Sequence, residues 1–227
     1  MGVAADNYRR MREQVAACAL RAGRPENAVR LLAVSKRFPP EAIRDVYQAG
    51  CRMFGESRPQ ELRDKTPLLP SDIAWHFIGP LQKNKIKYVA RNAALIHAVD
   101  TLELARALSE YAVRHNLVLR VLAEYNMSGE PAKHGFDPRA GAEPAWAMMA
   151  LPGLELRGFM TLAPRTDDAG AISRAFAGLR NIAEKAGEKA DVSSFELSMG
   201  MSGDYEIAIK EGSTLVRIGS AIFGPRR

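Results

Sequence analysis

The chain has 227 residues, of which 47% are hydrophobic and 26% charged, so it is long enough to bury a large core and is not compositionally disordered. The chain has 32 Lys and Arg against 26 Asp and Glu, and its net charge of +6 suits anionic ligands. The basic residues are spread along the chain and do not form the basic arm that is typical of nucleic-acid binding. The apolar runs are too short for a transmembrane helix and the N-terminus lacks a signal-peptide pattern, so we expect a cytoplasmic protein that does not enter a membrane.

The first half of the chain predicts an amphipathic helix followed by alternating strands and helices. Apolar side chains recur at helical spacing from Asp6 to Arg21, and Gly23 with Pro25 ends the pattern. Four repeats of one unit follow, and each unit consists of a short apolar run that predicts a strand and a helical pattern after it. We place the strands at 30–36, 51–56, 74–80 and 94–100, and the helices at 41–50, 59–65, 83–92 and 102–116.

The second half continues the same alternation. We place its strands at 117–126, 154–160, 195–200 and 214–224, and its helices at 138–150, 168–186 and 204–211. Eight strands, nearly all separated by helices, in a chain of this size predict an α/β fold, a single-domain (β/α)8 TIM barrel with an extra N-terminal helix, over residues 1–227. The sequence shows no linker that would mark a second domain.

A doubly wound open sheet is the alternative, because both folds bury parallel strands on both faces. Polar residues gather at the carboxyl ends of most predicted strands, and a barrel would bring all of these ends to one mouth, whereas an open sheet would not. This favours the barrel. The polar ends are Ser35 and Lys36, Glu56 and Ser57, Gly79, Asp100, Glu124 to Asn126, Met160 and Thr161, Ser198, and Ser220.

Lys36 directly follows the apolar run 31–34, an unusual place for a lysine. Against apolar walls the charged form of a lysine is destabilised, and the neutral amine can form a Schiff base with an aldehyde. The alternative for this residue alone is a packed stem with its ammonium in water.

The last two predicted strands each lead into a stretch that contains glycine and serine. The stretch 198–204 carries Ser202, and the stretch 217–224 carries Arg217, Gly219 and Ser220. Barrels often bind phosphate at the loops of strands seven and eight, although each loop alone is also compatible with an ordinary turn. A strand-end lysine across a barrel mouth from a phosphate site indicates pyridoxal 5'-phosphate as the cofactor.

Six motifs make the chain similar to the pyridoxal phosphate homeostasis protein family, whose members are single-domain barrels. The resemblance covers nearly the whole chain. It departs from the family at one position, because the family usually has Asn where Ser57 stands. The motifs are LAVSK (32–36), FGES (54–57), HFIGPLQKNK (76–85), GFMTLAP (158–164), ELSMGMSGD (196–204) and RIGSAIFG (217–224).

The resemblance implies roles for eight residues toward the cofactor. Lys36 would form the Schiff base, and Arg217 would lie near the pyridine nitrogen, where a permanent cation weakens the ring as an electron sink. Where the family's Asn makes a contact through its side-chain amide, the shorter Ser57 would have a shorter reach, or a water molecule would replace the amide. Ser202, Gly219 and Ser220 would hold the phosphate, and Ile78 and Met160 would line the pocket.

The resemblance also implies a function in intracellular pyridoxal phosphate homeostasis, by binding, buffering or delivering the cofactor, with effects on amino-acid and keto-acid balance. We expect a monomer without established catalytic activity, because the second domain of related racemases and decarboxylases is absent, and we expect apoenzymes that need the cofactor as partners. The alternative is a racemase or related amino-acid enzyme of low activity. Nucleic acid and membranes are not expected partners.

The remaining polar residues predict structural roles. His76 is expected to form hydrogen bonds within the barrel, while His97, His115 and His134 are expected to be structural or exposed. Residues 83–91 predict a solvated helix face, and both cysteines are expected to be reduced. No metal site is predicted.

Overall fold

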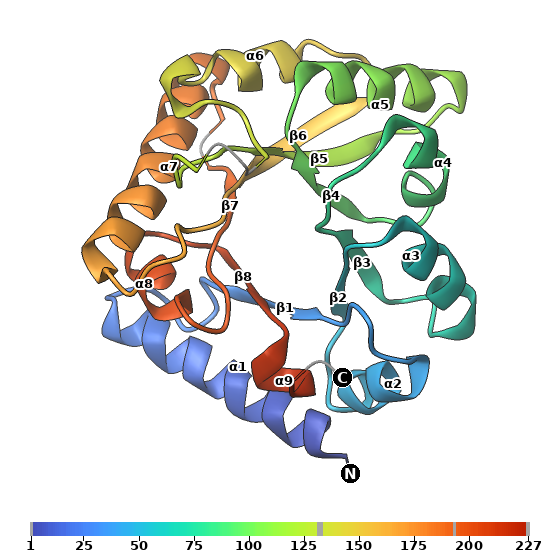
Figure 1. The fold of residues 1–227 in the computed structure, drawn as a ribbon, viewed down its shortest axis with the longest axis vertical. Coiled ribbons are helices and arrows are strands. Elements are labelled where there is room, and N and C mark those ends of the chain that lie inside the picture. The colour runs from blue at the N-terminus through green and yellow to red at the C-terminus, as the bar shows by residue number, and fades with distance from the viewer. Residues whose placement is uncertain (1, 131–133, 193, 226–227) are drawn as a thin grey trace.

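The computed structural model describes residues 2–130, 134–192 and 194–225, and its strands form a closed barrel (Figure 1). All eight strands are parallel and lie in chain order, and β1 pairs with β8 to close the ring. The predicted (β/α)8 barrel is confirmed, and the open sheet is excluded. The strands are β1 (Arg30–Val34), β2 (Met53–Glu56), β3 (Ala74–Phe77), β4 (Leu95–Val99), β5 (Leu119–Glu124), β6 (Leu154–Met160), β7 (Glu196–Ser198) and β8 (Leu215–Ile218).

The helices form the outer ring around these strands (Figure 1). The extra N-terminal helix is confirmed, and it packs against α2, α8 and α9 at the side where the barrel closes. The helices are α1 (Val3–Arg21), α2 (Pro40–Gln48), α3 (Pro59–Lys65), α4 (Ile86–Val89), α5 (Leu102–Arg114), α6 (Glu143–Met149), α7 (Ala169–Ala190), α8 (Tyr205–Lys210) and α9 (Ser220–Phe223), with 3₁₀ turns η1 (Thr66–Leu68), η2 (Lys83–Lys85) and η3 (Pro138–Ala140).

The last predicted strand is wrong at its end, and this matters for the site. The strand stops at Ile218, and residues 220–223 form one helical turn, with the Phe223 N–H donating to the Gly219 carbonyl at 2.9 Å. The ring of Phe223 stacks on Phe38, with centroids 5.0 Å apart. Locally, a short and mainly apolar stretch is compatible with a strand or with a helix. In the helical turn, Phe223 packs against the turn that follows β1. The predicted helix 83–92 is likewise shorter, divided between η2 and α4.

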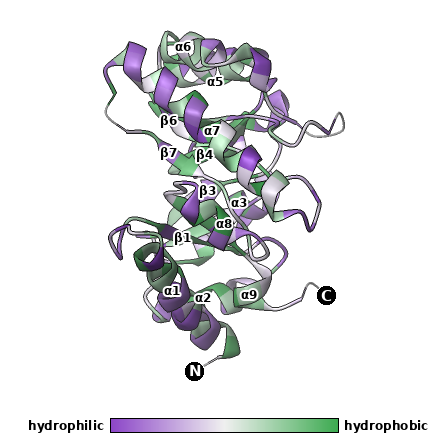
Figure 2. Ribbon diagram, turned by 90° about the vertical axis from the view of Figure 1, so that its left-hand side faces the viewer, coloured by the Kyte–Doolittle hydropathy of each residue, from purple (hydrophilic) through white to green (hydrophobic). Residues whose placement is uncertain are grey.

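The core has two parts, one inside the barrel and one between the barrel and its helices. Inside, the buried side chains of Leu95, Ala98, Leu122 and Met160 pack together. Outside, the strands carry a larger apolar layer against the inner faces of the helices, and Figure 2 shows hydrophobic strands at the centre with hydrophilic stretches on the helices. Parallel strands covered on both faces explain the nearly continuous apolar runs in the sequence. No helix in the described ranges is long and apolar enough to cross a bilayer.

Candidate functional site

Lys36 lies at the carboxyl end of β1, where the chain leaves the barrel. It stands in a turn closed by the Phe38 N–H, which donates to the Ser35 carbonyl at 3.1 Å, and its side chain is partly buried. The next residue, Arg37, has φ +68°, a left-handed conformation that costs a non-glycine residue about 1 kcal/mol. The backbone around Lys36 is therefore held in a conformation that the sequence alone does not favour.

The two predicted phosphate loops meet beside this strand. The hydroxyl oxygens of Ser202 and Ser220 lie 3.2 Å apart, although the residues are 18 positions apart in the chain. A Cβ added at Gly219 would lie 3.4 Å from the Val34 carbonyl oxygen, which places this loop against the end of β1. The structure thus brings Ser202, Gly219 and Ser220 together at the end of the strand that precedes Lys36.

Gly200 shapes the first of these loops. Its φ of +98° belongs to the region that favours glycine, and an added Cβ would lie 2.6 Å from the Ala208 side chain. The Met201 N–H donates to the Asp204 carboxylate at 2.5 Å, and burial raises the pKa of that carboxyl above its usual value. The loop therefore presents Ser202 between a turn that requires glycine and a carboxylate that holds the Met201 N–H.

Arg217 lies at the base of the mouth and is buried, with 4% of its surface exposed. Its Nη1 donates to the Ser198 carbonyl at 2.6 Å and to Ser198 Oγ at 2.7 Å, while Nη2 donates to the Thr161 carbonyl at 2.8 Å. Burial lowers the pKa of Arg217 to about 10, while the carboxylates of Glu124 and Asp204 act in the opposite direction. The guanidinium remains a cation at neutral pH and is fixed in place by three acceptors.

Two buried histidines continue the hydrogen bonds of Arg217 across the barrel. His97 Nδ1 lies 2.9 Å from Ser198 Oγ, and its Nε2 lies 2.9 Å from His76 Nδ1. Burial lowers the pKa of His76 to about 3 and that of His97 well below its usual value, so both rings are neutral at pH 7. The predicted hydrogen-bonding role of His76 is confirmed, whereas the partners of His97 cannot be identified from spacing.

A cavity of about 190 Å³ opens in the half of the mouth formed by β3 to β6. Ile78 and Met160, the two residues predicted to line a cofactor pocket, line this cavity, and so does Glu124, to which the sequence assigns no role. Burial raises the pKa of Glu124 to about 7, with the nearby Asp100 as the next cause. Asp100 itself pairs with His134 at 3.0 Å. The cavity therefore has apolar walls and one carboxyl group that titrates near neutral pH.

Ser57 follows β2 at the rim, close to the end of β3. A Cβ added at Gly79 would lie 2.2 Å from the Ser57 carbonyl oxygen, so the two chain segments touch through their backbones. The close approach requires glycine at position 79 and brings the Ser57 backbone beside the segment that carries Ile78. The assignment of Ser57 to the site stays a prediction.

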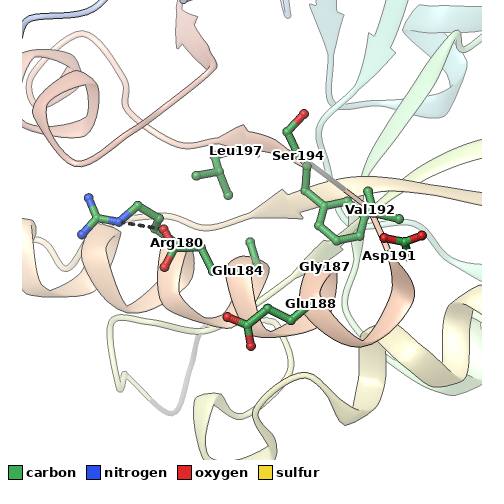
Figure 3. Close-up of a pocket in the computed structure, with 10 residues that line it drawn as sticks. Arg180, Glu184, Gly187, Glu188, Asp191, Val192, Ser194 and Leu197 are labelled. Atoms are coloured by element: carbon green, nitrogen blue, oxygen red, sulfur yellow. Dashed lines mark ion pairs between the residues drawn. The ribbon is translucent and has the colours of Figure 1, made fainter.

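A larger hollow, of about 620 Å³, lies beside the start of β7, and Figure 3 shows residues that line it. It is formed by the carboxyl end of α7 and the chain entering β7, and Arg180 pairs there with Glu184 at 3.6 Å. None of the predicted site residues lines it. Its lining residues are Arg180, Ala183, Glu184, Gly187, Glu188, Asp191, Val192, Ser194, Phe195 and Leu197.

Comparison with known proteins gives matches along nearly the whole chain. Residues 5–227 match the family described as alanine racemase, N-terminal domain. The pyridoxal phosphate homeostasis protein of Aquifex aeolicus is 39% identical over 225 residues, 99% of this chain and 99% of its own length. The protein of that name from Escherichia coli K12 is 41% identical over 229 residues, 98% and 96% of the two chains.

A solved structure agrees with these sequence relatives. PipY of Synechococcus elongatus, with PLP bound, matches with a TM-score of 0.79 and 35% identity over 92% of this chain and 100% of its own. The similarity therefore extends beyond the mouth motifs to the complete barrel.

Proposed function

Because the chain belongs to the alanine racemase N-terminal domain family and, within it, to the pyridoxal phosphate homeostasis proteins, we propose that it binds pyridoxal 5'-phosphate at the mouth of its barrel. The observation that carries the proposal is the meeting of the Ser202 and Ser220 hydroxyls, 3.2 Å apart, at the end of the strand that leads into Lys36. The amine proposed to react with the aldehyde and the loops proposed to hold the phosphate lie at one mouth, as this cofactor would require.

The residues present fit the cofactor. Lys36 would hold the aldehyde carbon covalently as a Schiff base, and Ser202, Gly219 and Ser220 would surround the phosphate. Arg217, a buried cation, would face the pyridine nitrogen, while Ile78 and Met160 form the apolar wall of the neighbouring cavity. Ser57 at the rim completes the proposed set. When bound, the cofactor supplies an electron-withdrawing ring and an exchangeable aldehyde.

The arrangement favours binding and exchange over turnover. The guanidinium of Arg217 is a cation that can only donate hydrogen bonds, and two carbonyl oxygens and a hydroxyl hold it in place, so beside the pyridine nitrogen it would disfavour protonation of that nitrogen. The ring would therefore be a weak electron sink. We infer a monomeric cytoplasmic protein that buffers the cofactor or delivers it to apoenzymes, and in this way affects amino-acid and keto-acid balance.

The experiment compares binding of pyridoxal 5'-phosphate with binding of pyridoxal, which lacks the phosphate. The wild type should bind the phosphorylated form far more tightly, and the ratio of the two dissociation constants should fall in Ser202→Ala/Ser220→Ala. Ser71→Ala, at an exposed position away from the mouth, is the matched control. Equal affinities for the two compounds in the wild type would contradict the proposed phosphate site.

A low-activity racemase is the second candidate, favoured by the family match to the N-terminal domain of alanine racemase. It predicts that the loaded protein exchanges the α-proton of an added amino acid with deuterium from the solvent, and that Lys36→Ala abolishes the exchange. Exchange at the rate of free pyridoxal 5'-phosphate would exclude this candidate and leave the homeostatic function.

A further inference from the structure

A buried group of charged side chains lies behind Lys36, between the barrel wall and α3. Lys65 Nζ donates to Glu56 Oε1 at 2.8 Å, to Glu61 Oε2 at 2.9 Å and to the Ser35 carbonyl at 3.2 Å. Glu56 has no exposed surface and Lys65 only 7%. We refer to Ser35, Glu56, Glu61 and Lys65 as the Lys65 cluster.

The strand alternation explains why these groups meet outside the barrel. A Cβ added at Gly55 would lie 3.2 Å from the Leu32 side chain and 3.4 Å from that of Ile78, so Gly55 faces the barrel interior. Successive residues of a strand point to opposite faces, which turns Glu56 outward toward α3. The i, i+4 spacing of Glu61 and Lys65 on that helix then presents both side chains to the back of β2.

The cluster holds the backbone on both sides of Lys36. On the preceding side, the Ser35 carbonyl accepts from Lys65, and the Ser35 hydroxyl donates to Glu56 at 2.7 Å. On the following side, the Arg37 N–H donates to Glu61 Oε2 at 2.8 Å. This last bond also fixes the residue whose φ is +68°. Ser35 and Arg37, on either side of Lys36, are thus tied to β2 and α3 through one ammonium group and two carboxylates.

Stability alone does not account for such a cluster. Burial raises the pKa of Glu56 despite the opposing effects of Lys65 and Ser35, and its Oε2 is buried without a hydrogen-bond partner in the part of the chain that the structure describes. Buried ion pairs are on balance no more stabilising than well-packed apolar residues. The cluster makes directional hydrogen bonds to the turn, which apolar residues could not make.

We propose that the Lys65 cluster is a positioning device for Lys36: Lys65 and Glu61, which lie outside the mouth, fix the 35–37 turn so that the Lys36 amine faces the phosphate loop. The inference rests on the proposed function, in which Lys36 carries the cofactor. Lys65 and Glu61 are positioning residues, because they act through the backbone of the turn.

The test uses Glu61→Ala, which removes the acceptor of the Arg37 N–H from a side chain that is 20% exposed. The rate of Schiff-base formation at Lys36, followed by absorption, should fall about tenfold, the factor that corresponds to about 1.4 kcal/mol. The dissociation constant of inorganic phosphate should stay unchanged, a separation that a general loss of structure would not give. Glu61→Gln keeps an acceptor oxygen and should restore most of the rate.

Glu103→Ala is the matched control, since Glu103 is also a first-turn glutamate paired with a lysine, but on α5 and away from the turn. Hydrogen exchange of the Arg37 amide, measured without cofactor, should accelerate in Glu61→Ala and not in Glu103→Ala. A wild-type rate of Schiff-base formation in Glu61→Ala would overturn the proposal. Failure of the wild type itself to react at Lys36 would instead overturn the proposed function, and the exchange of the Arg37 amide would still report whether Glu61 holds the turn.

Discussion

Arg217 and Ser198 are joined by two hydrogen bonds from a single nitrogen, because Nη1 lies 2.6 Å from the Ser198 carbonyl and 2.7 Å from its hydroxyl oxygen. Arginine can only donate, so Ser198 Oγ accepts from it, and among the described residues the other contact of this hydroxyl is His97 Nδ1, 2.9 Å away, to which we therefore assign the hydroxyl hydrogen. His97 must then carry its proton on Nε2 and donate to Nδ1 of His76. One donor-only side chain therefore sets the direction of the whole buried chain.

This direction predicts the tautomers of both histidines. His97 and His76 should each carry a single proton on Nε2, and neither ring should become charged between pH 8 and about pH 5, because burial depresses the pKa values of both. Two-bond ¹H–¹⁵N spectra of the imidazoles distinguish the tautomers directly, with the surface residue His115 as the exposed reference. Signals of a charged ring, or of Nδ1–H at His97, would contradict the predicted order of donors.

Replacing His76 should make the protein less sensitive to acid. The pKa of His76 is lowered in the folded state, to about 3 from 6.5, so between these pH values the unfolded chain binds a proton that the folded protein does not. The free energy of unfolding then falls as the pH falls, by about 1.4 kcal/mol per pH unit for this one group. His76→Gln should lose about 2 to 3 kcal/mol less than the wild type between pH 6.5 and 4.5 in urea denaturation. If the free energies of unfolding of the wild type and His76→Gln changed equally with pH, His76 would be protonated in the native state.

Glu124 should act in the opposite sense. Its pKa is raised in the folded state, from 4.5 to about 7, so at intermediate pH the native protein holds a proton that the unfolded chain has released, and stability falls as the pH rises through this window. Glu124→Gln resembles the protonated form. It should match the wild type at pH 4.5 and exceed it by about 3 kcal/mol at pH 8. Urea denaturation at the two pH values measures the difference, and a variant that is less stable at pH 8 would refute the assignment.

Gly219 in the proposed phosphate site and Gly200 in the loop that leads to Ser202 should respond differently to alanine. Gly219 has an ordinary negative φ, and an added Cβ would make a 3.4 Å contact, so Gly219→Ala should change stability by less than about 1 kcal/mol. The added methyl group would occupy the phosphate approach and should weaken pyridoxal 5'-phosphate binding about tenfold. Gly200→Ala combines a positive φ with a 2.6 Å clash and should cost about 1 to 3 kcal/mol. Unchanged cofactor affinity in Gly219→Ala would remove this loop from the site.

The sequence predicted the barrel and the location of its mouth because both follow from local patterns. Buried parallel strands read as short apolar runs, and polar residues such as Ser57 and Glu124 mark the points where those runs end. The meeting of Ser202 with Ser220 was also predictable, since strands seven and eight of a barrel are neighbours.

The remaining features depend on tertiary contacts that no local pattern encodes. His97 and Ser198 are 101 residues apart and meet only through the closed barrel, so the spacing of histidines along the chain did not indicate their bond. The Lys65 cluster requires the outward face of β2 and α3 to be packed together. The helical turn after Gly219 was missed because the apolar residues 221–223 resemble a continuation of the strand, although Gly219 and Ser220 interrupt the apolar run.

The central claim, that Lys36 carries pyridoxal 5'-phosphate, is tested most directly by locating the covalent bond. The protein is incubated with the cofactor, reduced with borohydride and digested, and the modified peptide is identified by mass spectrometry, beside Lys36→Ala and the surface control Lys87→Ala. We expect one reduced adduct on Lys36, with an absorption band before reduction that Lys87→Ala retains and Lys36→Ala lacks. A band of equal strength in Lys36→Ala, or adducts spread over surface lysines with none on Lys36, would contradict the claim.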